Sequence, residues 1–110
     1  MPPVNIVQST DLAGIKLLLT QDCPITYGTR LYSDWSEYKG APSVYLGSPP
    51  LAMGKNGPAQ HSMLIIGYDE GIGAFHIQNS QGAGWGADGY VWMAYETFSA
   101  LAERNAFYFA

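Results

Sequence analysis

Residues 59–90 read AQHSMLIIGYDEGIGAFHIQNSQGAGWGADGY. Two apolar runs flank the segment DEGIG, residues 69–73, whose composition is typical of a hairpin turn between two strands. Strand positions that lie equally far from such a turn come opposite one another. Counting outward on both sides brings His61 and Asn79 to the same end of the sheet, provided that one strand contains a bulge. The stretch therefore predicts a β-hairpin with a His–Asn pair at one end.

The elements outside this hairpin predict an α+β fold, an antiparallel β-sheet or half-barrel with one leading helix. The helix is expected over residues 9–20, where apolar residues recur at helical spacing and Ser9 or Thr10 can cap the first turn. Residues 33–60 are rich in Gly, Pro and Ser and predict a long loop. Further strands are expected in CPITYGTRLY (23–32), SVYL (43–46), GYVWMAY (89–95) and NAFYFA (105–110).

Length and composition indicate one folded domain over residues 1–110. Hydrophobic residues make up 47% of the chain, which argues against disorder, and Tyr68, Tyr90 and Trp92 are expected in the core. The net charge is −4 and the five Lys and Arg residues form no cluster, so neither nucleic acid nor a membrane is an expected partner. Residues 1–10 lack the pattern of a signal peptide, and the compartment stays open.

The chain has one cysteine and two histidines. A single cysteine cannot form an internal disulfide, and this set has no zinc-binding pattern, so we expect neither a metal site nor a cofactor. Cys23 follows the C-terminal end of the expected helix. A nucleophilic thiol is favoured at a helix N-terminus, where the dipole lowers its pKa. Cys23 is therefore expected to be a structural thiol.

His61 and Asn79 have side chains that can act together in catalysis. An asparagine beside a histidine can accept a hydrogen bond from one ring N–H and so fix the tautomer of the imidazole. The other ring nitrogen is then available as a base, which is the arrangement of a Cys–His–Asn triad. The alternative is that both residues are solvated or capping groups at a strand end. His76 lies on the opposite face of its strand from Asn79 and is expected outside the site.

Two segments of the chain resemble the papain-like (C1 family) cysteine peptidases. HSMLIIGYD (61–69) is similar to the family's histidine segment, in which an apolar strand and Gly-Tyr follow the histidine. FHIQNSQGAGWGADGYVWM (75–93) is similar to its asparagine segment, Asn-Ser-Trp-Gly-x-x-Trp-Gly-x-x-Gly-Tyr. The residues in register with that segment are Asn79, Ser80, Gly82, Trp85, Gly86, Gly89 and Tyr90. Residues 11–35 and the end of the chain are similar too, so the resemblance covers nearly the whole chain.

The resemblance implies the fold of the C-terminal subdomain of these peptidases, and the hydrolysis of peptide bonds in a peptide or protein substrate. His61 takes the position of the catalytic base, and Asn79 that of the residue that orients it. Trp85 matches an aromatic residue near the substrate cleft. Gln81 stands where the family usually has a tryptophan that shields the Asn–His hydrogen bond. Trp85 and Gln81 are therefore the candidate substrate-binding residues.

The family's nucleophile lies in a Cys-Gly-x-Cys-Trp segment, roughly 130–150 residues before the histidine. Counting back that far from His61 passes the first residue of the chain. We therefore expect a C-terminal half of such a peptidase, inactive by itself, that pairs with an N-terminal-half polypeptide or forms a homodimer. The alternative is a catalytically inactive, peptidase-derived binding module. A papain-like family with a Cys–His–Asp triad is disfavoured by Asn79 and the SQGAGWG segment after it.

Overall fold

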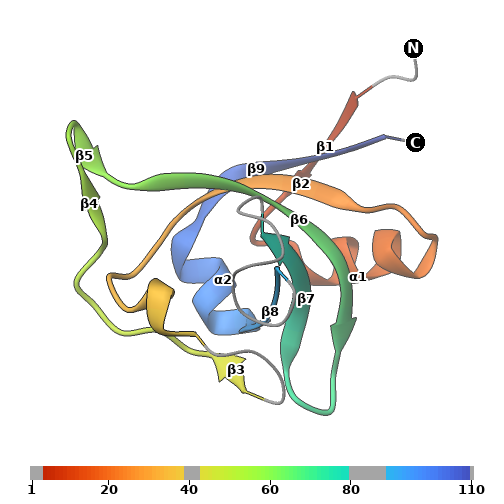
Figure 1. The fold of residues 1–110 in the computed structure, drawn as a ribbon. Helices are drawn as coiled ribbons and strands as arrows, with labels where there is room; N and C mark the ends of the chain where they lie inside the picture. The colour runs from red at the N-terminus through yellow and green to blue at the C-terminus, as the bar shows by residue number, and fades with distance from the viewer. Residues whose placement is uncertain (1–3, 39–42, 80–88, 110) are drawn as a thin grey trace.

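The computed structural model describes residues 4–38, 43–79 and 89–109, and it confirms the predicted fold class, a largely antiparallel sheet with helices (Figure 1). In this part of the chain, a seven-stranded sheet has the order β1-β9-β2-β6-β7-β8-β3. Neighbouring strands are antiparallel, except that β3 pairs with β8 in parallel. The strands are β1 (Val4–Gln8), β2 (Ile25–Arg30), β3 (Val44–Tyr45), β4 (Met53–Gly54), β5 (Gly57–Pro58), β6 (Gln60–Asp69), β7 (Ala74–Asn79), β8 (Tyr90–Ala94) and β9 (Ala102–Phe109). The helices are α1 (Leu12–Thr20), the 3₁₀ helix η1 (Trp35–Glu37) and α2 (Tyr95–Leu101).

β6 and β7 form the hairpin that the sequence predicts. The register between them shifts by one position between Ile65 and Gly67, so Ile66 is an extra residue that forms a bulge in β6. In the turn, the Asp69 carboxylate accepts a hydrogen bond from the backbone N–H of Gly71 at 2.8 Å. The predicted hairpin, its turn and its bulge are therefore confirmed.

α1 begins at Leu12, later than the sequence predicts, because Asp11 rather than Ser9 or Thr10 is its N-cap. The Asp11 carboxylate accepts a hydrogen bond from the Gly14 N–H at 2.9 Å, which satisfies one of the free donors of the first turn. Ser9 is instead buried, and its backbone N–H donates to a carbonyl of β9. The predicted cap at Ser9 or Thr10 is therefore wrong, because the backbone stays paired with β9 through Ser9 and the helix can begin only after it.

Several elements of the structure go beyond the predicted set. α2 lies between β8 and β9 and packs Phe98 against Tyr27 of β2 and Phe75 of β7, so the fold has a second helix. β1 precedes α1 and forms one edge of the sheet, where it pairs with β9. The predicted loop at 33–60 contains η1, β3 and the small β4–β5 hairpin as well as the start of β6.

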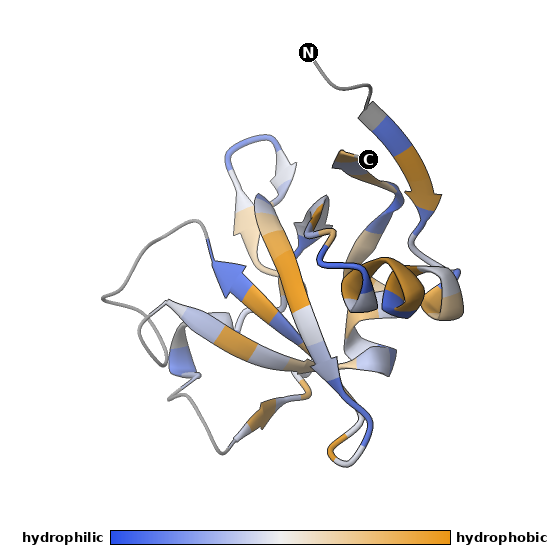
Figure 2. Ribbon diagram, turned by 90° about the vertical axis from the view of Figure 1, so that its right-hand side faces the viewer, coloured by the Kyte–Doolittle hydropathy of each residue, from blue (hydrophilic) through white to orange (hydrophobic). Residues whose placement is uncertain are grey.

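One hydrophobic cluster joins the two α-helices to the central strands. Figure 2 shows apolar residues in the middle of the strands and on α1, with hydrophilic residues at turns and strand ends. The buried members of the cluster are Ile15, Ile25, Tyr27, Leu31, Trp35, Tyr38, Tyr45, Met63, Ile65, Phe75, Ile77, Val91, Met93, Phe98 and Ala106. Within the described residues, no helix has the length and apolar composition needed to cross a membrane.

Tyr27 is a buried tyrosine whose hydroxyl has no hydrogen-bond partner among the described residues. Burial raises the pKa of this phenol, and the desolvated hydroxyl is left without compensation. We expect Tyr27→Phe to leave the free energy of unfolding unchanged or to raise it by about 1 kcal/mol, as measured by urea unfolding. The matched control is Tyr45→Phe. The Tyr45 hydroxyl donates to Asp34 at 2.6 Å, so its removal should lower stability by about 1–3 kcal/mol. A clear loss of stability in Tyr27→Phe would contradict this expectation.

Candidate active site

His61 of β6 and Asn79 of β7 lie on the same face of the sheet. Asn79 is directly opposite Met63, and His61 is two residues away from Met63 along β6. Because side chains alternate between the faces of a strand, His61, Met63 and Asn79 share one face. His61 and Asn79 are thus diagonal neighbours, a relation in which Cβ atoms lie about 7–8 Å apart or somewhat closer. The register brings the two residues together, while their mutual hydrogen bond and their catalytic roles stay predictions.

The two residues differ in their exposure to solvent. Asn79 is 2% exposed, and its backbone N–H donates to the carbonyl of Gly89 at 2.8 Å. His61 is half-buried and lies opposite Thr29 of β2, which is fully buried. A buried amide beside a half-exposed imidazole suits an orienting residue and a base, because the base must reach a substrate while its partner holds it in place.

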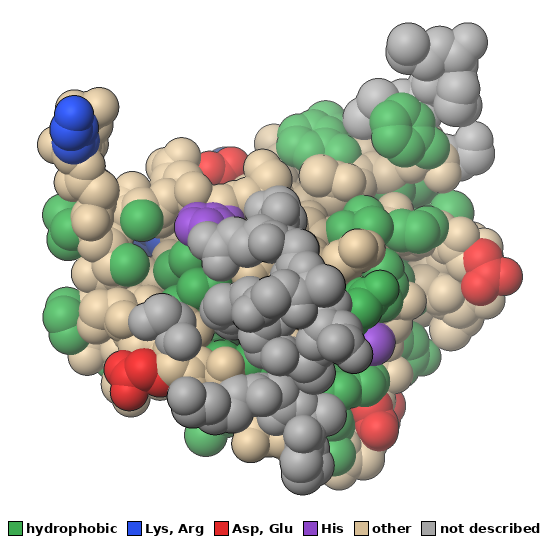
Figure 3. All heavy atoms as spheres, in the orientation of Figure 1, with side chains coloured by type: hydrophobic (Ala, Val, Ile, Leu, Met, Phe, Trp, Pro, Cys, Tyr) green, Lys and Arg blue, Asp and Glu red, His purple; other side chains and the backbone are tan. Residues whose placement is uncertain are grey.

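An open cavity of about 440 Å³ lies beside His61, between β2, β6 and β9. Its lining includes Thr26, Gly28, Gln60, His61, Glu103 and Phe107. Both histidine side chains of the chain are visible on the face shown in Figure 3. The sequence does not predict that Glu103 lines this cavity, because only the long-range pairing of β9 with β2 brings Glu103 next to β2. Thr26, Gly28 and Ser62 of its lining alternate along their strands with Thr29 and His61, so the cavity opens on the face of the sheet opposite the His61 side chain.

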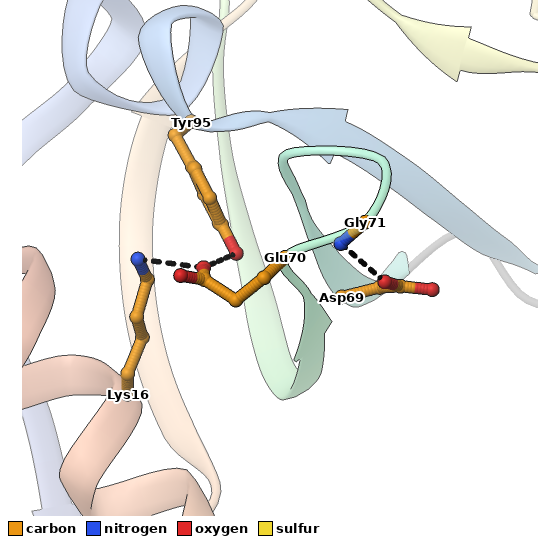
Figure 4. A network of polar contacts seen from close by, with 5 residues as sticks. All are labelled: Lys16, Asp69, Glu70, Gly71 and Tyr95. Carbon is orange, nitrogen blue, oxygen red and sulfur yellow. Dashed lines mark hydrogen bonds and ion pairs between the residues drawn. The ribbon is translucent and has the colours of Figure 1, made fainter.

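A polar network fixes the turn of the hairpin that carries the site (Figure 4). Nζ of Lys16, on α1, lies 2.8 Å from Oε1 of Glu70 in the turn, and the Tyr95 hydroxyl of α2 donates to the same oxygen at 2.5 Å. Lys16 Nζ also lies 4.2 Å from the centre of the Tyr95 ring. Hydrogen bonds from Lys16 and Tyr95 lower the pKa of the Glu70 carboxyl. Three separate elements therefore meet at one carboxylate, which holds the hairpin against both α-helices.

Cys23 lies far from His61. Cys23 comes two residues after Gln21, the C-cap of α1, and its Sγ donates to the carbonyl of Phe109 at 3.6 Å. His61 is opposite Thr29, six positions further along the same extended segment as Cys23. At a rise of about 3.3 Å per residue, this separates the thiol from the imidazole by roughly 20 Å. Cys23 therefore cannot be the nucleophile that His61 activates.

His76 belongs to a different surface. Its ring stacks on Trp92 of β8, with centroids 4.3 Å apart and planes 9° apart, and the Tyr90 ring lies 5.3 Å away. Burial lowers the pKa of His76. The register places this group on the face opposite Asn79, as the sequence predicts. Tyr90 and Trp92 are half-buried around His76, so their prediction as core residues is wrong, whereas Tyr68 packs against the core.

Two predicted site residues lie outside the described part of the chain. These are Gln81 and Trp85, the candidate substrate-binding residues. Among the described residues, no three His, Cys, Asp or Glu side chains come together in a way that could hold a metal ion. The described part of the candidate site therefore consists of His61 and Asn79.

Comparisons with known proteins show the family and the fold of this chain. The model of the papain family cysteine proteases matches residues 3–109. Xylellain, a cysteine protease from Xylella fastidiosa, is 30% identical, with a TM-score of 0.73 over 98% of this chain and 40% of that chain. A bromelain protease from Ananas comosus, solved with the inhibitor E64, is 22% identical, with a TM-score of 0.68 over 96% of this chain and 49% of that chain. At 22% identity, the likeness to the bromelain protease shows a shared fold alone.

The chain thus spans less than half the length of the solved proteases that it matches. No curated protein matches it. The family match extends over residues 3–109, and the structural match to xylellain covers 98% of the chain. The chain therefore belongs to the papain family of cysteine proteases and corresponds to a C-terminal portion of the papain-like fold.

Proposed function

We propose that this chain supplies the catalytic base, His61, and its orienting amide, Asn79, for the hydrolysis of peptide bonds. The nucleophilic cysteine would come from a part of the protease outside these 110 residues. The observation that carries the proposal is the β6–β7 register, which sets a buried Asn79 diagonal to a half-exposed His61 on one face. Family membership supplies the reaction class.

In the proposed reaction, one ring nitrogen of His61 accepts the proton of the cysteine thiol. The thiolate attacks the carbonyl carbon of the peptide bond, and the protonated imidazole gives its proton to the departing amine. The acyl-thioester that remains is hydrolysed by a water that His61 deprotonates in turn. Asn79 accepts a hydrogen bond from the other ring N–H, which keeps the imidazole in the required tautomer and orientation.

The surroundings of Asn79 favour this orienting role. Its side chain is almost fully buried, and a hydrogen bond in such a medium is stronger than one in water. Asn79 is also anchored through its backbone, by the hydrogen bond to Gly89 at the start of the segment that leads into β8. An amide held in this way keeps the imidazole ring in one orientation. The amide itself loses little conformational freedom when the base acts.

The partner that we propose is a polypeptide with the nucleophile-bearing half of the papain-like fold. Leu46 and Met53, in the segment between η1 and β6, are largely exposed, and apolar surface of this kind tends to mark an interaction site. A homodimer would cover the same surface. Light scattering of the chain, alone and mixed with the nucleophile-bearing half, distinguishes the two partners.

The decisive experiment compares the isolated chain with the same chain joined to the nucleophile-bearing half. We expect hydrolysis of a fluorogenic peptide by the joined protein and none by the isolated chain, because the Cys23 thiol lies roughly 20 Å from the imidazole. Cys23→Ala in the joined protein should leave the rate unchanged. Turnover by the isolated chain that disappears in Cys23→Ala would overturn the proposal. Binding of peptides without cleavage by the joined protein would favour an inactive binding module instead.

A further inference from the structure

We propose that Thr29 is a positioning residue for the His61 imidazole. Its side chain closes the β2 side of the ring, while Asn79 holds the ring from the side of β7. The inference rests on the proposed function, because it treats His61 as the base. It goes further by naming a residue outside the His–Asn pair on which the orientation of the base depends.

Thr29 is the cross-strand neighbour of His61. The two residues lie directly opposite one another in the antiparallel pairing of β2 and β6, and their side chains share one face of the sheet. Directly opposite residues have Cβ atoms about 4.5–5.5 Å apart, whereas the diagonal relation of His61 to Asn79 corresponds to about 7–8 Å. Since β6 lies between β2 and β7, the imidazole has Thr29 on one side and Asn79 on the other.

The side chain of Thr29 is held in one conformation. Thr29 is fully buried, and its branching at Cβ restricts the rotation about the Cα–Cβ bond. Its hydroxyl also donates a hydrogen bond to the backbone carbonyl of Arg30 at 2.8 Å. A functional group is positioned most precisely by neighbours whose own rotamers are fixed in this way. The imidazole therefore lies beside a fixed surface.

The strand pairing turns the Thr29 hydroxyl away from His61. The Asn79 N–H donates toward β8, so Met63, opposite Asn79, directs its own N–H and C=O toward β2. His61, two residues away on β6, does the same, and Thr29 directs its backbone groups toward β6. The next carbonyl, that of Arg30, then points toward β9, and the Thr29 hydroxyl donates to it. The methyl group is thus the branch of Thr29 that can meet the imidazole.

The other buried side chains near Thr29 in the same segment are larger. Ile25, Tyr27 and Leu31 are buried at alternate positions, and Thr29 is the smallest residue of this set. A small branched residue opposite His61 leaves room for the ring and still limits its rotation. The expected contribution of Thr29 is therefore its shape, with the hydroxyl serving to fix the side chain itself.

Two substitutions of Thr29 separate the methyl group from the hydroxyl. Thr29→Val keeps the branched shape and removes the hydroxyl, whereas Thr29→Ser keeps the hydroxyl and removes the methyl group. In the protein that contains the nucleophile, we expect kcat of Thr29→Val to stay within about twofold of the unsubstituted value. Thr29→Ser should lower kcat by about ten- to hundredfold, the effect of a misplaced reacting group, with little change in KM.

Thr97→Ser is the matched control, because it makes the same change at another buried threonine. Thr97 lies on α2, and its hydroxyl donates to the carbonyl of Leu46 at 2.6 Å, near β3, which is three strands away from β6 in the sheet. Its kcat should stay within about twofold, with urea unfolding used to confirm that every variant is folded. An unchanged kcat in Thr29→Ser, or an equal loss in Thr29→Val, would overturn the inference.

Nuclear magnetic resonance of the 110-residue chain gives a readout that needs no turnover. The couplings between the Hα and Hβ protons of His61 should indicate one rotamer in the chain and in Thr29→Val, and averaging between rotamers in Thr29→Ser. His76 is the internal reference, because its ring stacks on Trp92 on the opposite face and should not respond.

The two readouts distinguish failure of this inference from failure of the proposed function. Peptide cleavage that Thr29→Ser does not impair would refute the inference and leave the proposed function standing. An imidazole that becomes mobile only in Thr29→Ser, in a protein that contains the nucleophile but cleaves no peptide, would do the reverse.

Discussion

Replacing His61 with alanine in the protein that contains the nucleophile is expected to lower kcat for peptide hydrolysis by about a hundred- to ten-thousand-fold. The imidazole is the proposed carrier of the proton between thiol, amine and water, and the other histidine, His76, lies on the opposite face of the sheet. Steady-state kinetics with a fluorogenic peptide measure the effect. KM should change much less than kcat, because the lost interaction acts mainly in the transition state.

His76→Ala is the matched control, since it removes the other histidine from the opposite face of the sheet. Its kcat should stay within about twofold of the unsubstituted value, as for a surface change away from the reacting groups. Asn79→Ala should have an intermediate effect, about two- to tenfold, which corresponds to the loss of one hydrogen bond. Retention of more than a tenth of kcat in His61→Ala would rule out the proposed base.

Phe98→Ala is expected to lower the free energy of unfolding by about 3–5 kcal/mol. The Phe98 side chain is fully buried on α2, and its ring lies 5.0 Å from that of Tyr27 and 4.9 Å from that of Phe75. Truncation would leave a cavity at the point where α2, β2 and β7 meet. Because domains of this size are stable by only about 5–15 kcal/mol, the variant should unfold at a much lower urea concentration, followed by tryptophan fluorescence.

Phe109→Ala provides the comparison for this truncation. The same residue type lies exposed at the end of β9, so its loss should change stability by about 0.5 kcal/mol or less. Equal losses in the two variants would mean that the packing of α2 contributes little to the core.

The part of the site that the sequence predicts lies within one hairpin. The turn residues after Asp69 and the apolar strands on each side are local signals, and they determine where His61 and Asn79 come to lie. The bulge was needed for this alignment and could be inferred from the count of residues on each side of the turn. Local chemistry was therefore sufficient to bring the base and its amide to one end of the sheet.

The elements that sequence analysis missed depend on contacts between distant parts of the chain. β1 is short and polar at several positions, and it becomes a strand by pairing with β9, about a hundred residues later; the side chains of Gln8 and Asn105 hydrogen-bond across this pair. α2 follows β8 without a break, so the sequence of residues 89–95 predicts a single strand and hides the start of the helix. The position of Glu103 was missed for the same reason, since only the irregular pairing of β9 with β2 brings this residue to the cavity.

The register of this hairpin also limits where its length can vary. Deletion of Leu64, between the bulge and the histidine, would shift every earlier residue of β6 by one position against β7, and His61 would then point to the other face of the sheet while Asn79 kept its own. Deletion of Ile66 would only remove the bulge, because Ile65 and Gly67 already pair with the consecutive residues Ile77 and His76. Insertions in the turn after Asp69 leave both strands in phase. Length variation among homologous hairpins of this kind should therefore concentrate in the turn and spare the strand that carries the histidine.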